Sequence, residues 1–166
     1  MKKDNLGTRM KGYEYIPRTY LTKRIPVIIR LDGKAFHTFT KGMKRPFDEI
    51  LIKTMQDTAK YLCENIQGVK LAYTQSDEIT LLLTDFEDIN TQGWFDYNIQ
   101  KMVSVSASMA TLAFNTSFER EIKEFFNKNI AYRTFEDDEL ESEEYKKYQE
   151  ARKYFELIKN KISRAY

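Results

Sequence analysis

The sequence predicts an α+β fold in which an antiparallel sheet carries helices on one face. Short apolar runs rich in β-branched residues have the length of buried strands, as at 26–31. Two longer stretches repeat their apolar residues at helical spacing. These segments follow one another in the order strand, helix, strand, strand, helix, strand, which is the ferredoxin-like βαββαβ arrangement.

Length and composition fit one soluble domain. The chain has 166 residues and a mass of 19.8 kDa, and we assign 1–135 to the domain and its N-terminal arm, and 136–166 to a charged helical tail. The apolar runs are too short to cross a bilayer, so no membrane association is expected. With no signal peptide and a single cysteine, Cys63, a reducing cytoplasmic setting is expected.

Charge is distributed unevenly, although the net charge is only +2. Residues 1–30 contain eight basic and two acidic residues, and residues 145–166 contain seven basic and two acidic ones. Between them, residues 136–144 contain seven acidic residues and no basic one. Basic ends suit a nucleic-acid backbone, whereas the commoner alternative is that they are solvated surfaces.

The first 24 residues are expected to form a short helix or an irregular arm that packs its tyrosines on the body. These tyrosines are Tyr13, Tyr15 and Tyr20. Helical spacing begins after Asp48, which is the predicted N-cap of a helix that ends near Asn65. The polar loop before that helix contains Lys41, Lys44 and Arg45.

The first strand, about 26–31, stops at a carboxylate and a glycine, Asp32 and Gly33. Glycine permits a tight turn and a close approach of the backbone to a ligand. The next residues, Lys34 to His37, offer successive backbone N–H groups of the kind that cradle phosphates. This strand end is therefore a predicted nucleotide site.

Two further strands, Val69–Thr74 and Ile79–Thr84, are predicted to form an antiparallel hairpin. Side chains alternate along a strand, so only one of the loop acids Asp77 and Glu78 is expected to face Asp32, and we predict Asp77. Two aspartates at neighbouring strand ends suit Mg²⁺, which prefers oxygen ligands. The alternative is that both are ordinary turn residues.

The second half of the chain predicts one long helix, one strand and one final helix. The first helix covers about 94–118, the strand Ile130–Phe135, and the final amphipathic helix 145–165. The strand would complete the βαββαβ order, which is also found in the palm of many polymerases. A single histidine, His37, and a single cysteine exclude a zinc cluster and a Cys/His relay.

Four segments in order resemble the tRNA-His guanylyltransferase family, and most closely its bacterial-type guanylyltransferase-like proteins. They are RLDGKAFHTF at 30–39, KRPFD at 44–48, AYTQSDEITLLL at 72–83 and FDYNIQKMVSVSASMATLAF at 95–114. The resemblance covers about 10–118 and implies a polymerase palm-like fold. It also implies Mg²⁺-dependent addition of nucleotides to the 5′ end of tRNA or tRNA-like RNA, in the 3′-to-5′ direction.

The resemblance further implies roles for individual residues, with GTP, ATP or other triphosphates as substrates. Two Mg²⁺ ions would be held by Asp32, the Gly33 carbonyl and Asp77, with Glu78 completing the catalytic set and Ser76 supporting it. The triphosphate would lie on the backbone of Lys34, Ala35, Phe36 and His37, with Lys44, Asp48 and Lys101 near the nucleotide. A homo-oligomer, either a dimer or a tetramer, is implied as well.

Two departures from the family pattern keep other functions open. Tyr97 and Asn98 stand where many members have a basic pair, and Ala131 stands where the family has an aspartate. The alternatives are a palm-type nucleotide cyclase or small polymerase, and a shortened, inactive module that binds nucleotide or RNA.

Overall fold

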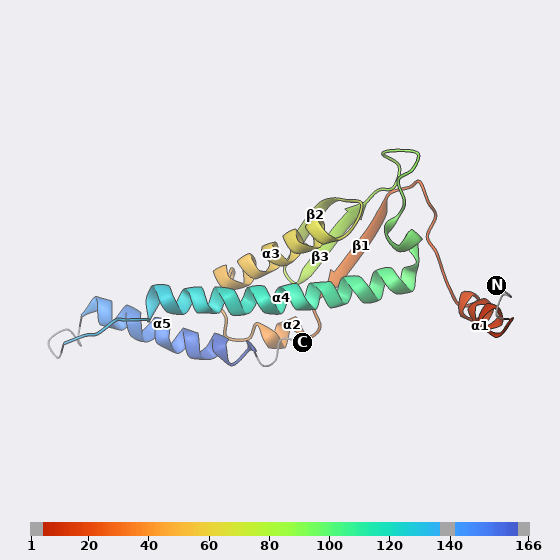
Figure 1. The fold of residues 1–166 in the computed structure, drawn as a ribbon. Coiled ribbons are helices and arrows are strands. Elements are labelled where there is room, and N and C mark those ends of the chain that lie inside the picture. The colour runs from red at the N-terminus through yellow and green to blue at the C-terminus, as the bar shows by residue number, and fades with distance from the viewer. Residues whose placement is uncertain (1–4, 137–141, 163–166) are drawn as a thin grey trace.

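The computed structural model describes residues 5–136 and 142–162, and it confirms the predicted α+β class. The first half contains α1 (Asn5–Tyr15), β1 (Val27–Asp32), α2 (Phe36–Phe39), α3 (Glu49–Asn65), β2 (Val69–Gln75) and β3 (Glu78–Leu83). The second half contains the 3₁₀ helix η1 (Trp94–Tyr97), α4 (Ile99–Asn129) and α5 (Glu143–Lys159). Figure 1 shows α4 as the long central element beside which the sheet, α3 and α5 are arranged.

The sheet has the order β1-β3-β2, with β3 antiparallel to both neighbours. This confirms the predicted hairpin, whose turn is Ser76 and Asp77. Along β1, Val27 and Ile29 are buried whereas Ile28 is exposed. One face of the sheet is therefore covered and the other is open.

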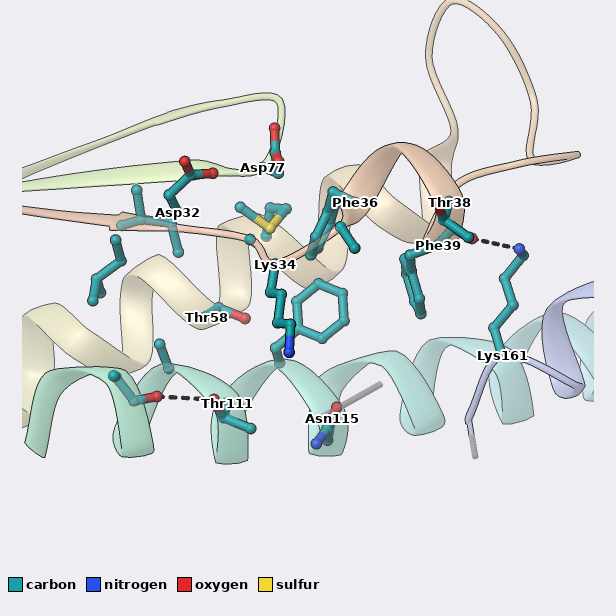
Figure 2. A pocket seen from close by; sticks show the side chains of 18 residues that line it. Asp32, Lys34, Phe36, Thr38, Phe39, Thr58, Asp77, Thr111, Asn115 and Lys161 are labelled. Atoms are coloured by element: carbon teal, nitrogen blue, oxygen red, sulfur yellow. Dashed lines mark hydrogen bonds between the residues drawn. The ribbon is translucent and has the colours of Figure 1, made fainter. Parts of the chain in front are cut away.

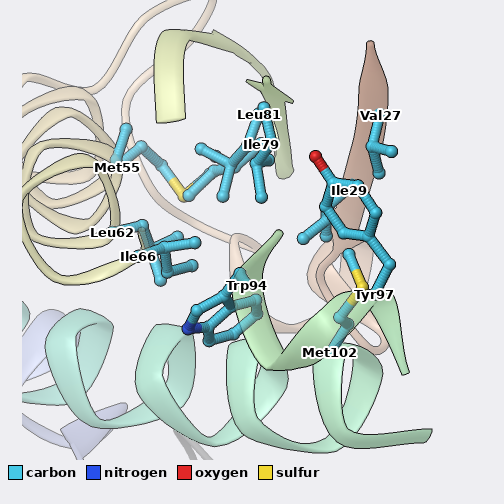
Figure 3. Close-up of a cluster of buried hydrophobic side chains, with 12 residues drawn as sticks. Val27, Ile29, Met55, Leu62, Ile66, Ile79, Leu81, Trp94, Tyr97 and Met102 are labelled. Atoms are coloured by element: carbon cyan, nitrogen blue, oxygen red, sulfur yellow. The ribbon is translucent and has the colours of Figure 1, made fainter. Parts of the chain in front are cut away.

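The covered face forms the main hydrophobic core with α3, η1 and the first part of α4 (Figure 3). Leu62, Leu81, Leu83 and Tyr97 have no exposed surface at its centre. Burying one leucine side chain stabilises the fold by roughly 2 kcal/mol. This core fixes the sheet on the helices and so fixes where the strands end.

Asp48 caps α3 as predicted. Its Oδ1 accepts hydrogen bonds from the amides of Ile50 at 3.1 Å and Leu51 at 3.2 Å. Its Oδ2 accepts from the Lys44 amide at 3.0 Å and from the Tyr154 hydroxyl. Since an N-cap alone contributes about 1 kcal/mol, this carboxylate is a strong structural anchor.

The predicted fourth strand at Ile130–Phe135 is wrong, because α4 continues to Asn129 and residues 131–136 form a turn and coil. Ile122 and Phe125 continue the helical spacing past the predicted end at 118 and pack with Phe118 in a second hydrophobic cluster. Phe135 contacts α5 instead of the sheet, with its ring 5.1 Å from that of Tyr148.

The predicted helix at 94–118 is also divided in two. Phe95, Asp96 and Tyr97 have φ values of 50°, 56° and 59°, so η1 cannot continue directly into α4. The side chain of Asn98 then begins α4 by accepting a hydrogen bond from the Lys101 amide at 3.1 Å.

The final helix is confirmed and packs along α4, burying Ile158 completely in the second cluster. That cluster consists of Met43, Ile50, Phe118, Ile122 and Ile158, with partly buried neighbours. The predicted division into 1–135 and 136–166 stays a prediction. Residues 137–141 of the acidic run and the end of the predicted 145–165 helix lie outside the described residues.

The expected packing of the N-terminal tyrosines is wrong for Tyr13 and Tyr15, which are 60% and 63% exposed. Helix α1 contains no buried residue and lies apart from the body in Figure 1. After α1, two backbone hydrogen bonds join the chain to the body: the Thr19 carbonyl accepts from the Ile99 amide at 2.9 Å, and the Leu21 amide donates to the Tyr97 carbonyl at 3.1 Å. Within the described ranges, no helix combines the length and apolarity needed to cross a membrane.

Candidate functional site

The fold brings Asp32 and Asp77 together, as predicted. Strand β1 ends at Asp32, and the next amide, that of Gly33, donates to the Asp77 carbonyl at 3.2 Å. This hydrogen bond joins the end of β1 to the turn between β2 and β3. Figure 2 shows both carboxylates on the side of the pocket away from α4.

Of the two loop acids, Asp77 lines the pocket with Asp32, whereas Glu78 does not line it. Glu78 pairs directly with Asp32 in the antiparallel register, and directly opposed residues project to the same face. Asp77 itself lies in the turn between β2 and β3. Glu78 forms an ion pair with Arg30 at 3.5 Å on this open face.

A pocket of about 330 Å³ lies between the strand ends, α2, α3 and α4. Asp32, Gly33, Lys34, Ala35, Phe36 and Asp77 line it from the predicted site. Lys34 extends into the pocket toward α4 in Figure 2. No ion pair of the Lys34 ammonium is found among the residues with described positions.

The pocket walls from α3 and α4 were missed from the sequence. They include Met55 and Thr58 on α3, and Ala107, Ala110, Thr111, Phe114 and Asn115 on α4. The small residues of α4 occur at helical spacing, which predicts a helix face that another part of the molecule or a ligand can approach closely. That spacing alone does not reveal what approaches the face.

The Phe36 ring leaves no room for a side chain at position 33, so this position has to be glycine. A Cβ atom at position 33 would lie 2.2 Å from Cδ2 of the Phe36 ring. Ala35, with φ of 55°, turns the chain into α2, and its carbonyl accepts from the amides of Thr38 at 2.9 Å and Phe39 at 3.1 Å. In the described part of the chain, the amides of residues 34–37 donate no hydrogen bond, so they are available to a ligand.

The remaining predicted residues do not line this pocket. His37 is exposed, and Ser76 occupies the hairpin turn with φ of 56°. The ammonium of Lys44 lies 5.2 Å from the Tyr154 ring centre, and that of Lys101 lies 5.6 Å from the Phe95 ring centre. Their assignment to a nucleotide stays a prediction.

Asp48 is buried, and its carboxylate is engaged by three amides and by Tyr154. Burial, followed by the Asp48 hydrogen bond, raises the pKa of Tyr154 well above its ordinary value. The Tyr154 hydroxyl therefore stays protonated and donates to Asp48 at neutral pH. Here Asp48 fixes the loop that precedes α3.

The oxygen atoms near the strand ends are the type of ligand that Mg²⁺ binds. Asp32, Asp77 and the Gly33 carbonyl supply only oxygen, and Mg²⁺ is usually bound by one or two carboxylates together with substrate phosphates and waters. Among the described residues, no three His, Cys, Asp or Glu side chains are grouped closely enough to enclose a metal by themselves. A triphosphate would have to complete such a site.

Comparison with known proteins places these features in a family. The family description "tRNAHis guanylyltransferase" matches residues 7–151. The tRNA(His) guanylyltransferase of Schizosaccharomyces pombe is 30% identical over 107 residues, which is 63% of this chain and 38% of that protein. The chain thus spans less than half the length of this curated relative.

Two solved structures share the fold at higher identity. A bacterial tRNA(His) guanylyltransferase-like protein in complex with GTP is 50% identical, with a TM-score of 0.66 over 70% of this chain and 56% of that one. Such a protein in complex with ATP is 49% identical, with a TM-score of 0.67 over 72% and 53% of the two chains. The predicted palm-like fold class is confirmed, and the chain belongs to the tRNAHis guanylyltransferase family.

Proposed function

We propose that this protein is a Mg²⁺-dependent nucleotidyltransferase that adds nucleotides to the 5′ end of tRNA or tRNA-like RNA in the 3′-to-5′ direction. The observation that carries the proposal is the pair of aspartates at neighbouring strand ends, joined by the Gly33–Asp77 hydrogen bond at the edge of the pocket. The GTP and ATP complexes of similar proteins support a triphosphate as the substrate.

In the proposed site, Asp32, the Gly33 carbonyl and Asp77 hold two Mg²⁺ ions. When bound, the ions neutralise the phosphates and stabilise the attacking and leaving oxygens. The free amides of residues 34–37 orient the triphosphate, and the Lys34 ammonium adds positive charge inside the pocket. Glu78 supports the site through its direct pairing with Asp32.

The chain's own contribution to the chemistry is then positioning and charge. The 3′-hydroxyl of the incoming nucleotide attacks the phosphorus of the activated 5′ end of the RNA. The new P–O bond replaces the bond to the activating group, which leaves as pyrophosphate from a 5′-triphosphate or as a nucleoside monophosphate from a nucleotide-capped end, and the hydroxyl proton passes to water. Holding the two ends together in a fixed orientation lowers the barrier because little freedom remains to be lost. Because backbone hydrogen bonds fix the strand ends, they reorganise little during the reaction.

Binding of tRNA is proposed to use the basic residues near the ends of the chain. A tRNA is a dense polyanion, so Lys and Arg side chains outside the pocket must hold its backbone. Helix α5 exposes Lys146, Lys147, Arg152 and Lys153. A dimer or tetramer would enlarge this surface, because one small subunit offers little area for a tRNA.

The test is incubation of the protein with labelled GTP or ATP, Mg²⁺ and a tRNA lacking its first 5′ nucleotide. The expected product is RNA that is longer by one or more nucleotides at the 5′ end. Asp32→Asn, with similar size and no charge, should form no product, whereas Asp88→Asn in the exposed loop after β3 should match the unmodified protein. Triphosphate binding without any 5′ extension would favour an inactive binding module.

A further inference from the structure

A buried lysine at the end of α5 reaches back to the loop that follows the predicted phosphate cradle. Lys161 is only 8% exposed, and its ammonium donates to the Phe39 carbonyl and, at 3.0 Å, to the Lys41 carbonyl. The same ammonium lies 5.6 Å from the centre of the Phe39 ring. Figure 2 shows Lys161 reaching α2 from the α5 side of the pocket.

Two other residues of the same segment contact the same loop. A Cβ atom at Gly42, whose φ is 85°, would lie 3.1 Å from Cδ1 of Leu157, so the Leu157 side chain lies over this glycine. Tyr154 donates to Asp48 at the far end of the loop. Tyr154, Leu157 and Lys161 follow one another at near-helical spacing, so one edge of α5 and the turn after it follow the loop from 39 to 48.

The backbone of this loop has little regular structure of its own. Its internal hydrogen bonds include Met43 amide to Thr40 carbonyl at 3.0 Å and a long contact of 3.4 Å from the Lys41 amide to the Thr38 carbonyl. The loop begins directly after α2, and Phe36, Thr38 and Phe39 line the pocket together with Lys161. Its position therefore sets one wall of the pocket.

We propose that Lys161 is a positioning residue, which holds α2 and the loop after it in the arrangement that binds the nucleoside triphosphate. This inference rests on the proposed function, since the pocket must be the triphosphate site. Lysine suits the task because its ammonium has three donors on a long apolar stem. Charged donors form stronger hydrogen bonds to buried carbonyls than neutral ones do.

The test compares Lys161→Met and Lys161→Arg with Lys159→Met, a matched control on the exposed side of α5. Hydrogen exchange of ligand-free protein should show amides 38–45 of Lys161→Met exchanging about tenfold faster, with α3 and the sheet unchanged. Calorimetry with GTP and Mg²⁺ should show about tenfold weaker binding. Lys161→Arg should keep most of the exchange protection at 38–45 and most of the GTP affinity. Lys159→Met should match the unmodified protein in both measurements.

Each other outcome has a definite meaning. Unchanged exchange at 38–45, or unchanged GTP affinity, overturns the positioning role. Faster exchange throughout the protein with normal GTP affinity shows a merely structural lysine. Failure of the unmodified protein to bind GTP refutes the proposed function instead, and exchange at 38–45 alone then decides whether Lys161 holds the loop. If Lys161→Met does not fold, Lys161→Gln is measured in its place.

Discussion

The two basic ends of the chain look alike in sequence but differ in the structure. Helix α1 buries none of its residues, and Figure 1 shows it apart from the body. Helix α5 buries Ile158 completely and contacts the loop beside the pocket through Tyr154 and its C-terminal turn. Two helices of similar charge therefore differ in how they are held: α5 and the turn after it pack on the body beside the pocket, whereas α1 buries no residue.

The largest expected effect tests whether the chemistry takes place at the strand ends, on the side of the body where α5 packs. Asp77→Asn should lower the rate of nucleotide addition about a thousandfold or more, because it removes a metal ligand worth several kcal/mol in the transition state. The backbone hydrogen bond from Gly33 should survive, so the fold should be kept. Rates are measured with saturating Mg²⁺.

The matched control is Asp96→Asn, which weakens an exposed ion pair with Lys23 near the N-terminal segment. It should leave the rate of addition unchanged. A near-normal rate for Asp77→Asn would show that the metal assignment is wrong.

The second prediction compares the anchoring of the two helices. Ile158→Ala should lower the free energy of unfolding by about 3 kcal/mol, because it leaves a cavity in the second hydrophobic cluster. Met10→Ala in α1 should change it by less than about 0.5 kcal/mol, since Met10 is exposed. Urea unfolding of both variants measures the difference, and equal losses would contradict the contrast.

The third prediction concerns RNA. Replacing the four basic residues of α5 with glutamate (Lys146, Lys147, Arg152 and Lys153) should weaken tRNA binding about a hundredfold and flatten its salt dependence. Triphosphate affinity should stay the same, because none of these residues lines the pocket. Binding is measured by filter retention at several salt concentrations.

The comparison variant is Arg9→Glu with Lys11→Glu in α1. It should lose less affinity, because α1 buries none of its residues, whereas α5 packs on the body beside the pocket. If the α1 variant loses more affinity than the α5 variant, α1 is the main RNA contact. If both keep full affinity, the basic ends are only solvated surfaces.

The smallest expected effect isolates one contact of α5. Tyr154→Phe should lower the free energy of unfolding by about 1 kcal/mol, because the buried Asp48 carboxylate loses one of its donors. Tyr13→Phe in α1 is the control and should have no effect, since this ring is exposed. If Tyr154→Phe leaves the free energy of unfolding unchanged, the three amides that donate to the Asp48 carboxylate are sufficient to stabilise it.

Local sequence signals predicted the centre of the molecule well. The cap at Asp48, the hairpin around Ser76 and Asp77, and the strand end at Asp32 each depend on neighbours within a few residues. Such signals are strong because the backbone conformation they require is short and specific.

The features that were missed depend on distant packing. The extension of α4 to Asn129 needs α5 as a partner, and the hydrogen bond from Lys161 to Lys41 spans 120 positions in the sequence. The exposed α1 and the α4 wall of the pocket are likewise properties of the assembled fold. Helical spacing reports an apolar face, but not which element will cover it.

Four phenylalanine rings connect the two hydrophobic clusters beside the pocket. Their centres are 5.3 Å apart for Phe36–Phe39, 5.4 Å for Phe36–Phe114, 5.3 Å for Phe39–Phe118 and 5.8 Å for Phe114–Phe118. Phe36 and Phe114 pack against the main core, while Phe118 is buried in the second cluster. Melting of either cluster would strip contacts from the other, so scanning calorimetry should record a single cooperative transition for the folded body.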